Sequence, residues 1–377
     1  MTERPRLAII CTHPIQYYTP MFKLMARSVE LKVFFTMGQI PEYDRGFQKK
    51  FHWDIPMLEG YDHQFLYNKA ARPGTHHFFG IVNPGAITAI DHFAPHYILI
   101  YGWANYSHLK IMYHYKGKTP ILFRGDSTSL KPRNLFFELI KDRVLRHIYQ
   151  QIDIAVFTGS NNKAYFSKYK VPDRRLVFAP HAIDNKRFSR KNPLTKIRET
   201  LNISPEKTLI LFTGKLIPIK NPRLLLKAFS ALDRPDIHLL IVGDGPQGGE
   251  LKKKYKQSNI HYMPFQNQAR MPAIYQACDL FCMPSISESW GMAVNEAMAA
   301  GKAILTSDQT GAAADLIKPE NGMTFKSSNP SDLKEKLMTM TRDKQKLLEM
   351  GQASQKIIQV WDFENQIKGI LHAISSI

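Results

Sequence analysis

Short apolar runs alternate with helical patterns twice along this 377-residue chain, and the alternation limits the folds open to it. The runs RLAIIC (6–11) and IAVFTG (154–159) in the first half, and LILFTGKL (209–216) and KAILTS (302–307) in the second, are nearly continuous in apolar residues. Such strands are typical of parallel sheets that helices cover on both faces. Two arrays of this kind predict two doubly wound, Rossmann-like α/β domains.

The length of the chain also fits two domains. A polar, charged stretch, DNKRFSRKNPLTK, covers residues 184–196 and marks the expected boundary, so we predict domains over 1–183 and 184–360. Residues 361–377 have the pattern of an amphipathic helix, which is a candidate to cross back to the first domain. Ligands bind beyond the carboxyl ends of the strands in open α/β sheets, so we expect a site in a cleft across which the domains face each other.

Composition argues against several classes of protein. The sequence contains no run of 18 apolar residues, so we expect no membrane-spanning helix. The N-terminus lacks the pattern of a secretory signal. The three cysteines have neither metal nor redox spacing, which predicts a cytoplasmic protein without a disulfide framework. The net charge of +19 leaves four interpretations open: a solvated basic surface, an anionic membrane partner, nucleic acid, or phosphorylated substrates.

Loops rich in glycine and lysine follow two strands of the second half. The first of these strands ends at Thr213, and Gly214, Lys215 and Lys220 follow it. This pattern suits a diphosphate, because lysine supplies mobile positive charge and glycine lets the backbone come close, although two solvated lysines are the alternative. The next strand ends in Gly243-Asp244-Gly245-Pro246, which predicts a tight turn near the ligand.

Two glutamates bracket a transition from loop to helix in ESWGMAVNE, residues 288–296. A helix N-terminus offers N–H groups and partial positive charge, and Gly291 lets a phosphate approach them. Carboxylates such as Glu288 and Glu296 accept hydrogen bonds from sugar hydroxyls. The alternative is a capping acid and a solvated acid, but an unpaired charge is costly in the apolar surroundings of Glu296.

Together these motifs resemble glycosyltransferase family 4, the group 1 glycosyl transferases. The resemblance rests on E-x-x-G-x-x-x-x-E at 288–296 and on the segments GKLIPIKN, IVGDGP and EAMAAGKAIL. In the first of these segments, Lys215 stands where arginine is usual in the family. The likeness is strong over residues 205–326 and looser in the first half. It implies the GT-B fold and a retaining transfer of sugar from a nucleotide diphosphate sugar, with neither metal nor cofactor.

The resemblance also implies roles for single residues. Lys215 and Lys220 would hold the donor diphosphate and stabilise the charge that develops on the leaving group. Glu288 would bind hydroxyls of the donor sugar, and Glu296 those of the ribose. The other expected donor contacts are Gly214 and Gly243, Pro264 and Phe265 beside the base, and the backbone of Gly291 and Met292 at the phosphate.

The first half offers candidates for the acceptor side. His13 and Gln16 lie in the loop CTHPIQYYTP and are expected either as sugar contacts or in a solvent-facing turn. In RGDS, Arg124 is a further candidate contact, and Asp126 stands where many family members place a histidine. Asp126 is expected to stabilise the transition state or orient the acceptor hydroxyl, with a structural cap or a pair with Arg124 as the alternative.

Two further segments carry expectations. APHAID resembles the segment at the family's domain junction, with His181 in place of the usual asparagine and Asp184 as a helix cap. Residues 131–151 predict a helix that packs on its own sheet or docks on an anionic membrane holding a lipid-linked acceptor. Its expected apolar face includes Ile140, Val144 and Ile148, and its basic face Lys141, Arg143 and Arg146.

The combined hypothesis is a glycosyltransferase with Asp126, Glu288, Lys215 and Lys220 as its catalytic set. The expected acceptor is a glycan or a lipid-linked glycan in surface polysaccharide assembly. A nucleotide-sugar epimerase or hydrolase with similar donor contacts is one alternative. A non-catalytic nucleic-acid-binding protein is another, but the chain lacks a nucleic-acid-binding motif.

Overall fold

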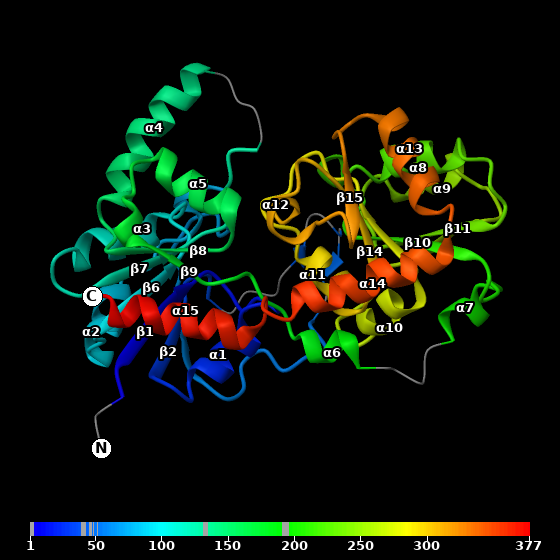
Figure 1. The fold of residues 1–377 in the computed structure, drawn as a ribbon. Helices are drawn as coiled ribbons and strands as arrows, with labels where there is room; N and C mark the ends of the chain where they lie inside the picture. The colour runs from blue at the N-terminus through cyan, green and yellow to red at the C-terminus, as the bar shows by residue number, and fades with distance from the viewer. Residues whose placement is uncertain are drawn as a thin grey trace. The chain divides into compact units, whose positions relative to one another are not determined.

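The computed structural model describes residues 4–38, 43–44, 47, 49–50, 52–130, 135–190 and 196–377. The chain forms two compact units (Figure 1). Unit 1 comprises Met1–Pro41, Pro56–His181 and Phe363–Ile377, and unit 2 comprises Glu42–Ile55 and Ala182–Asp362. Among the described residues, no helix combines the length and apolar character needed to cross a bilayer.

Unit 1 is built on a seven-stranded parallel sheet with the order β5-β2-β1-β6-β7-β8-β9. The order reverses around β1, so the chain winds outward in both directions from this strand. The strands are β1 (Arg6–Cys11), β2 (Glu30–Phe35), β5 (Asp62–Phe65), β6 (Tyr97–Tyr101), β7 (Ile121–Arg124), β8 (Ile154–Phe157) and β9 (Leu176–Phe178). The helices are α1 (Thr19–Met25), η1 (Phe78–Gly80), α2 (Ala86–Phe93), α3 (Tyr106–Tyr115), α4 (Leu135–Tyr149), α5 (Ser160–Lys168), η2 (Asp173–Arg175) and α15 (Phe363–Ser375).

The C-terminal helix α15 packs on the sheet of unit 1, beside β9 and α1 (Figure 1). Gly369 makes this close packing possible, since a Cβ at that position would lie 2.2 Å from the carbonyl oxygen of Phe178. The last 15 residues of the chain therefore complete the unit that its first residues begin.

Unit 2 has a six-stranded parallel sheet with the order β12-β11-β10-β13-β14-β15, which reverses between β10 and β13. The two sheets confirm the predicted pair of doubly wound α/β domains. The strands are β10 (Thr208–Thr213), β11 (Ile237–Val242), β12 (Ile260–Met263), β13 (Leu280–Met283), β14 (Ala303–Ser307) and β15 (Gly322–Phe325), and a separate antiparallel pair is formed by β3 (Tyr43–Asp44) and β4 (Lys49–Lys50). The helices are α6 (Asn185–Ser189), α7 (Ile197–Thr200), η3 (Pro218–Lys220), α8 (Pro222–Ser230), α9 (Gly248–Lys254), α10 (Met271–Ala277), α11 (Met292–Ala299), α12 (Ala313–Leu316), α13 (Pro330–Met340) and α14 (Lys344–Ile358).

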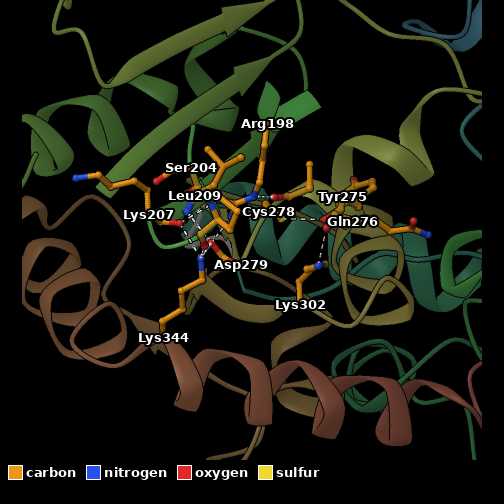
Figure 2. Close-up of polar contacts among 12 residues, drawn as sticks. Arg198, Ser204, Lys207, Leu209, Tyr275, Gln276, Cys278, Asp279, Lys302 and Lys344 are labelled. Carbon is orange, nitrogen blue, oxygen red and sulfur yellow. Dashed lines mark hydrogen bonds and ion pairs between the residues drawn. The ribbon is translucent and has the colours of Figure 1, made fainter. Parts of the chain in front are cut away.

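A polar network fixes the amino ends of β10 and β13 (Figure 2). The carboxylate of Asp279 accepts from Leu209 N–H at 2.8 Å and from Arg198 Nη2 at 2.5 Å, and Lys344 Nζ lies 3.5 Å from it. Arg198 also donates from Nε to the carbonyl oxygen of Ala277 at 2.8 Å. The network thereby ties α7 and α14 to the sheet at the edge opposite to the one where ligands bind in this class of fold.

Helix α4 confirms the predicted helix, whose first expected residues, 131–134, lie outside the described part of the chain. Leu145 and Ile148 are buried, but Ile140 and Val144 are 52% and 47% exposed. Ile140 and Val144 therefore lie outside the part of the predicted apolar face that is buried in unit 1. They are four residues apart and lie side by side on the helix, whereas Leu145, Ile148 and Tyr149 pack in the core of unit 1.

Two basic side chains of α4, Lys141 and Arg146, have partners within unit 1. Lys141 Nζ lies 5.1 Å from the ring centroid of Tyr165 and 3.8 Å from Glu138. Arg146 pairs with Asp142 at 2.8 Å. Part of the predicted basic face is thus neutralised by groups of the same unit.

Candidate active site

The loops after β10 and β11 lie against each other at the carboxyl edge of the second sheet. Gly214 N–H donates to Val242 O at 3.0 Å, and Leu216 N–H donates to Asp244 O at 2.9 Å. Gly243 has a φ of 141°, and a Cβ there would lie only 1.9 Å from the carbonyl oxygen of Gly214. Glycine is required because the two backbones approach too closely for any side chain. The backbone on both sides of Lys215 is therefore held in place by the neighbouring loop.

Lys220 and Glu288, which are 68 residues apart in sequence, form an ion pair between Nζ and Oε2. Their loops are also joined through the backbone, since Ile286 N–H donates to Ile219 O at 2.8 Å. The two side chains are 29% and 15% exposed, so the pair remains open to solvent on one side. The structure thus brings together Lys220, which is predicted to bind the diphosphate, and Glu288, which is predicted to bind the donor sugar.

The backbone around Glu288 is fixed by the loop after β14. Glu288 forms an isolated parallel bridge with Thr310, in which Glu288 N–H donates to Gln309 O and Gly311 N–H donates to Glu288 O, both at 3.0 Å. Gly291 follows with φ of 100° and is the N-cap of α11. The left-handed backbone at Gly291 turns the chain so that the N–H groups of Met292 and its successors begin the helix.

Glu296 is a buried carboxylate, with only 3% of its surface exposed. Its Oε2 accepts a hydrogen bond from the hydroxyl of Tyr275 in α10 at 2.7 Å. The hydroxyl of Thr213, at the end of β10, lies 3.0 Å from that of Tyr275 and donates to it, because the tyrosine proton is directed at the carboxylate. The alternative of a solvated helix acid was therefore wrong. Binding of ribose hydroxyls stays a prediction for Glu296.

Pro264 and Phe265 follow β12, the edge strand beside β11. Phe265 N–H donates to the Asp244 carboxylate at 3.1 Å, which joins this loop to the glycine-rich turn. The aromatic ring of Phe265 lies 4.6 Å from that of Phe47. No motif in the first half indicated that Phe47 would lie beside these second-half loops.

In unit 1, Arg124 and Asp126 lie at the carboxyl end of β7. Arg124 is only 2% exposed, and its guanidinium donates to the carbonyl oxygens of Ala179 and Pro180 at 2.9 and 3.0 Å. Burial lowers its pKa, while the nearby Asp126 carboxylate opposes that change. Arg124 thus anchors the backbone just before His181, where the chain leaves unit 1. Its role as a sugar contact stays a prediction.

Aromatic side chains gather around this arginine. Tyr18 lies 4.8 Å from Tyr101 and 6.5 Å from His181, with the Tyr18 and His181 rings nearly parallel. Burial raises the pKa of Tyr18 and of Tyr101, and burial together with the Arg124 charge lowers the pKa of His181. These residues lie near the carboxyl ends of β6 and β7. The sequence marked only His181 among them, as part of the junction segment.

The loop after β1 holds the remaining acceptor-side candidates. His13 Nδ1 is 2.9 Å from Thr12 Oγ1, and the carbonyl oxygen of His13 lies 3.4 Å from the Cys11 thiol that donates to it. His13 and Gln16 are both half-buried. Near the start of the second segment of unit 2, Asp184 caps α6 by accepting from Arg187 N–H at 3.0 Å, as predicted.

Residues 194–357 match the family described as glycosyl transferases group 1. The chain is 26% identical over 216 residues to a D-inositol 3-phosphate glycosyltransferase of Rhodococcus opacus, covering 54% of this chain and 48% of the relative. It is 27% identical over 229 residues to a lipopolysaccharide 1,2-N-acetylglucosaminetransferase of Salmonella typhimurium, covering 56% and 60%. The chain spans about half the length of relatives such as the first of these.

Solved structures resemble the whole chain. Anabaena Alr3699/HepE in complex with UDP and glucose has a TM-score of 0.75 at 16% identity, covering 99% of this chain and 100% of that one. Sucrose-phosphate synthase from Thermosynechococcus elongatus has a TM-score of 0.77 at 16% identity, with coverages of 99% and 98%. At this identity the likeness concerns the fold, and it confirms the predicted GT-B class.

Proposed function

We propose that the chain, whose residues 194–357 match the family described as glycosyl transferases group 1, is a retaining, metal-independent glycosyltransferase. It moves a sugar from a nucleotide diphosphate sugar to a glycan or lipid-linked glycan. The relative that acts on lipopolysaccharide supports an acceptor of this class, and the HepE complex with UDP and glucose supports the donor class. An anionic membrane surface, where such an acceptor would reside, is the proposed secondary partner.

The pairing of Lys220 with Glu288 beside Gly291 is the observation that carries this proposal. Departure of a nucleoside diphosphate places negative charge on its oxygens. Lys215, Lys220 and the N-terminus of α11 would stabilise that charge more in the transition state than in the bound donor. Each such donor is worth about 10²–10³ in rate at comparable oxyanion sites. No metal ion is required for this stabilisation.

The two glutamates extend the same site towards the two sugars of the donor. Glu288 accepts from donor-sugar hydroxyls, and Glu296, oriented by Tyr275, accepts from the ribose. Asp126 acts in catalysis on the acceptor side, with His13, Gln16 and Arg124 as further contacts. Within the described residues, no group of three or more metal-ligating side chains is assembled.

Thermal unfolding with a panel of UDP, GDP, ADP and CMP tests the donor site. A ligand present at about a hundredfold excess over its Kd stabilises the folded state by about 2.7 kcal/mol. We expect one nucleoside diphosphate to raise the melting temperature of the wild type and of Lys227→Ala, an exposed lysine of α8. The shift should be lost in Lys220→Ala. Equal shifts in all three proteins would contradict the proposed donor site.

Product analysis separates transfer from the alternative reactions. A transferase gives a new glycoside only when acceptor is added to the nucleotide sugar. Release or isomerisation of the sugar at full rate without acceptor would instead indicate a hydrolase or an epimerase. Salt-sensitive binding of a polynucleotide with no response to nucleotide sugars would indicate a nucleic-acid-binding protein.

A further inference from the structure

A segment from the first half of the chain, Glu42–Ile55, belongs to unit 2 although the chain on both sides of it belongs to unit 1. Hydrogen bonds hold its end to the loop after β12. Asn267 Nδ2 donates to the carbonyl oxygen of His52 at 2.6 Å, and Ala269 N–H donates to the Asp54 carboxylate oxygens at 3.0 and 3.1 Å. We call the described residues Phe47, His52, Trp53 and Asp54 the strap.

Two aromatic side chains of the strap meet the candidate donor site. Phe47 lies 4.6 Å from Phe265, with the ring planes inclined by 59°. Trp53 lies 6.4 Å from Phe265 in an edge-to-face arrangement. The Nζ of Lys215 lies 5.2 Å from the ring centroid of Phe47. One half-buried side chain therefore contacts both the loop after β10 and the loop after β12.

These two loops have different tasks in the proposed function. Lys215 binds the diphosphate, and Phe265 flanks the base. An aromatic face attracts an ammonium group, and this contact restricts where Lys215 holds its charge. Aromatic faces also stack on nucleobases. The hydrogen bonds of His52 and Asp54 hold one end of the strap to the loop after β12, and Phe47 extends its contacts to Lys215 and Phe265.

We propose that Phe47 is a wall of the donor pocket that the strap adds from the first half of the chain. It positions the ammonium of Lys215 for the diphosphate and, with Phe265, lines the space for the base. This inference rests on the proposed function and names a nucleoside diphosphate as the ligand class. Phe47 then contributes to donor affinity although it lies far outside the family signature.

Isothermal titration with the best-stabilising nucleoside diphosphate of the panel, and with inorganic pyrophosphate, tests the wall. We expect Phe47→Ala and Phe47→Leu to weaken binding of the nucleoside diphosphate by about tenfold. Pyrophosphate binding should weaken less, because it lacks the base. Phe47→Tyr keeps the aromatic face and should bind within about twofold of the wild type.

Phe79→Ala is the matched control, since Phe79 is an aromatic side chain of unit 1 that is 63% exposed. It should bind as the wild type does. Wild-type affinity in Phe47→Ala and Phe47→Leu, with binding still lost in Lys220→Ala, would overturn the wall and leave the proposed function intact. Absence of nucleotide binding in the wild type would overturn both. If Phe47→Ala does not fold, the contrast between Phe47→Leu and Phe47→Tyr decides.

Discussion

Trp290 and Trp361 stack on each other, with ring centroids 5.1 Å apart and planes inclined by 30°. Trp290 belongs to the motif at 288–296, and its Nε1 donates to Asn295 Oδ1 at 2.9 Å. Trp361 precedes Asp362, which forms an isolated parallel bridge with Ile183. The chain crosses from one unit to the other just before Ile183 and again just after Asp362. The stack therefore joins the connecting segments to the backbone of the candidate site.

Replacing Trp361 by alanine should destabilise the protein by about 3 kcal/mol, because a large, buried aromatic side chain is lost and a cavity remains. Urea unfolding measures the change. Val360→Ala is the control, since the neighbouring valine is 62% exposed and should alter stability by less than about 0.5 kcal/mol. Similar losses in both variants would show that the stack itself contributes little.

Glu288→Gln should lower turnover about 10²–10³-fold while the protein stays folded. The substitution keeps the size of the side chain but removes the charge that pairs with Lys220. Because this pair is partly exposed, stability should change by no more than about 1 kcal/mol. Steady-state kinetics with the donor found by the nucleotide panel and a thermal melt give the two values. Near-normal turnover would remove Glu288 from the catalytic set.

Tyr275→Phe should destabilise the protein by about 1–3 kcal/mol, because the buried Glu296 carboxylate loses the hydrogen bond from the tyrosine hydroxyl. The affinity for the nucleoside diphosphate should fall more than the affinity for pyrophosphate, since Glu296 is proposed to hold the ribose. Urea unfolding and titration calorimetry supply the measurements. Tyr67→Phe, at a position 77% exposed in unit 1, should change neither. Equal loss of both ligands would place Glu296 away from the ribose.

His181→Asn should make the protein less sensitive to acid. Burial, with the Arg124 charge, lowers the pKa of His181 in the folded state well below its usual value. The unfolded chain then binds a proton that the folded chain does not as pH falls below about 6.5, so the free energy of unfolding falls with it. This one group contributes a slope of about 1.4 kcal/mol per pH unit in that range.

Urea unfolding of His181→Asn between pH 7.5 and 5 measures this slope. The variant should retain a smaller acid dependence, because burial also lowers the pKa of His108. Identical slopes in the variant and the wild type would mean that His181 binds its proton over the same pH range in the folded and the unfolded protein.

The buried strands could be predicted because each is apolar on both faces, which leaves a continuous signal in the sequence. The four apolar runs at 6–11, 154–159, 209–216 and 302–307 correspond to β1, β8, β10 and β14 of the two sheets. The strand β5 was missed, since its residues Asp62–Phe65 alternate between exposed and half-buried positions at a sheet edge. Exposed edge strands carry polar residues and do not stand out from loops.

The sequence by itself determined the two α/β arrays, the glycine-rich turns and the pair of glutamates around Gly291. These follow from local rules: apolar runs, backbone conformations that favour glycine, and the spacing of one motif. Only the tertiary structure revealed the ion pair of Lys220 with Glu288 and the hydrogen bond from Tyr275 to Glu296. It also revealed the contact of Lys215 with the ring of Phe47. Such pairs join segments up to 168 residues apart, and side-chain packing rather than local preference brings them together.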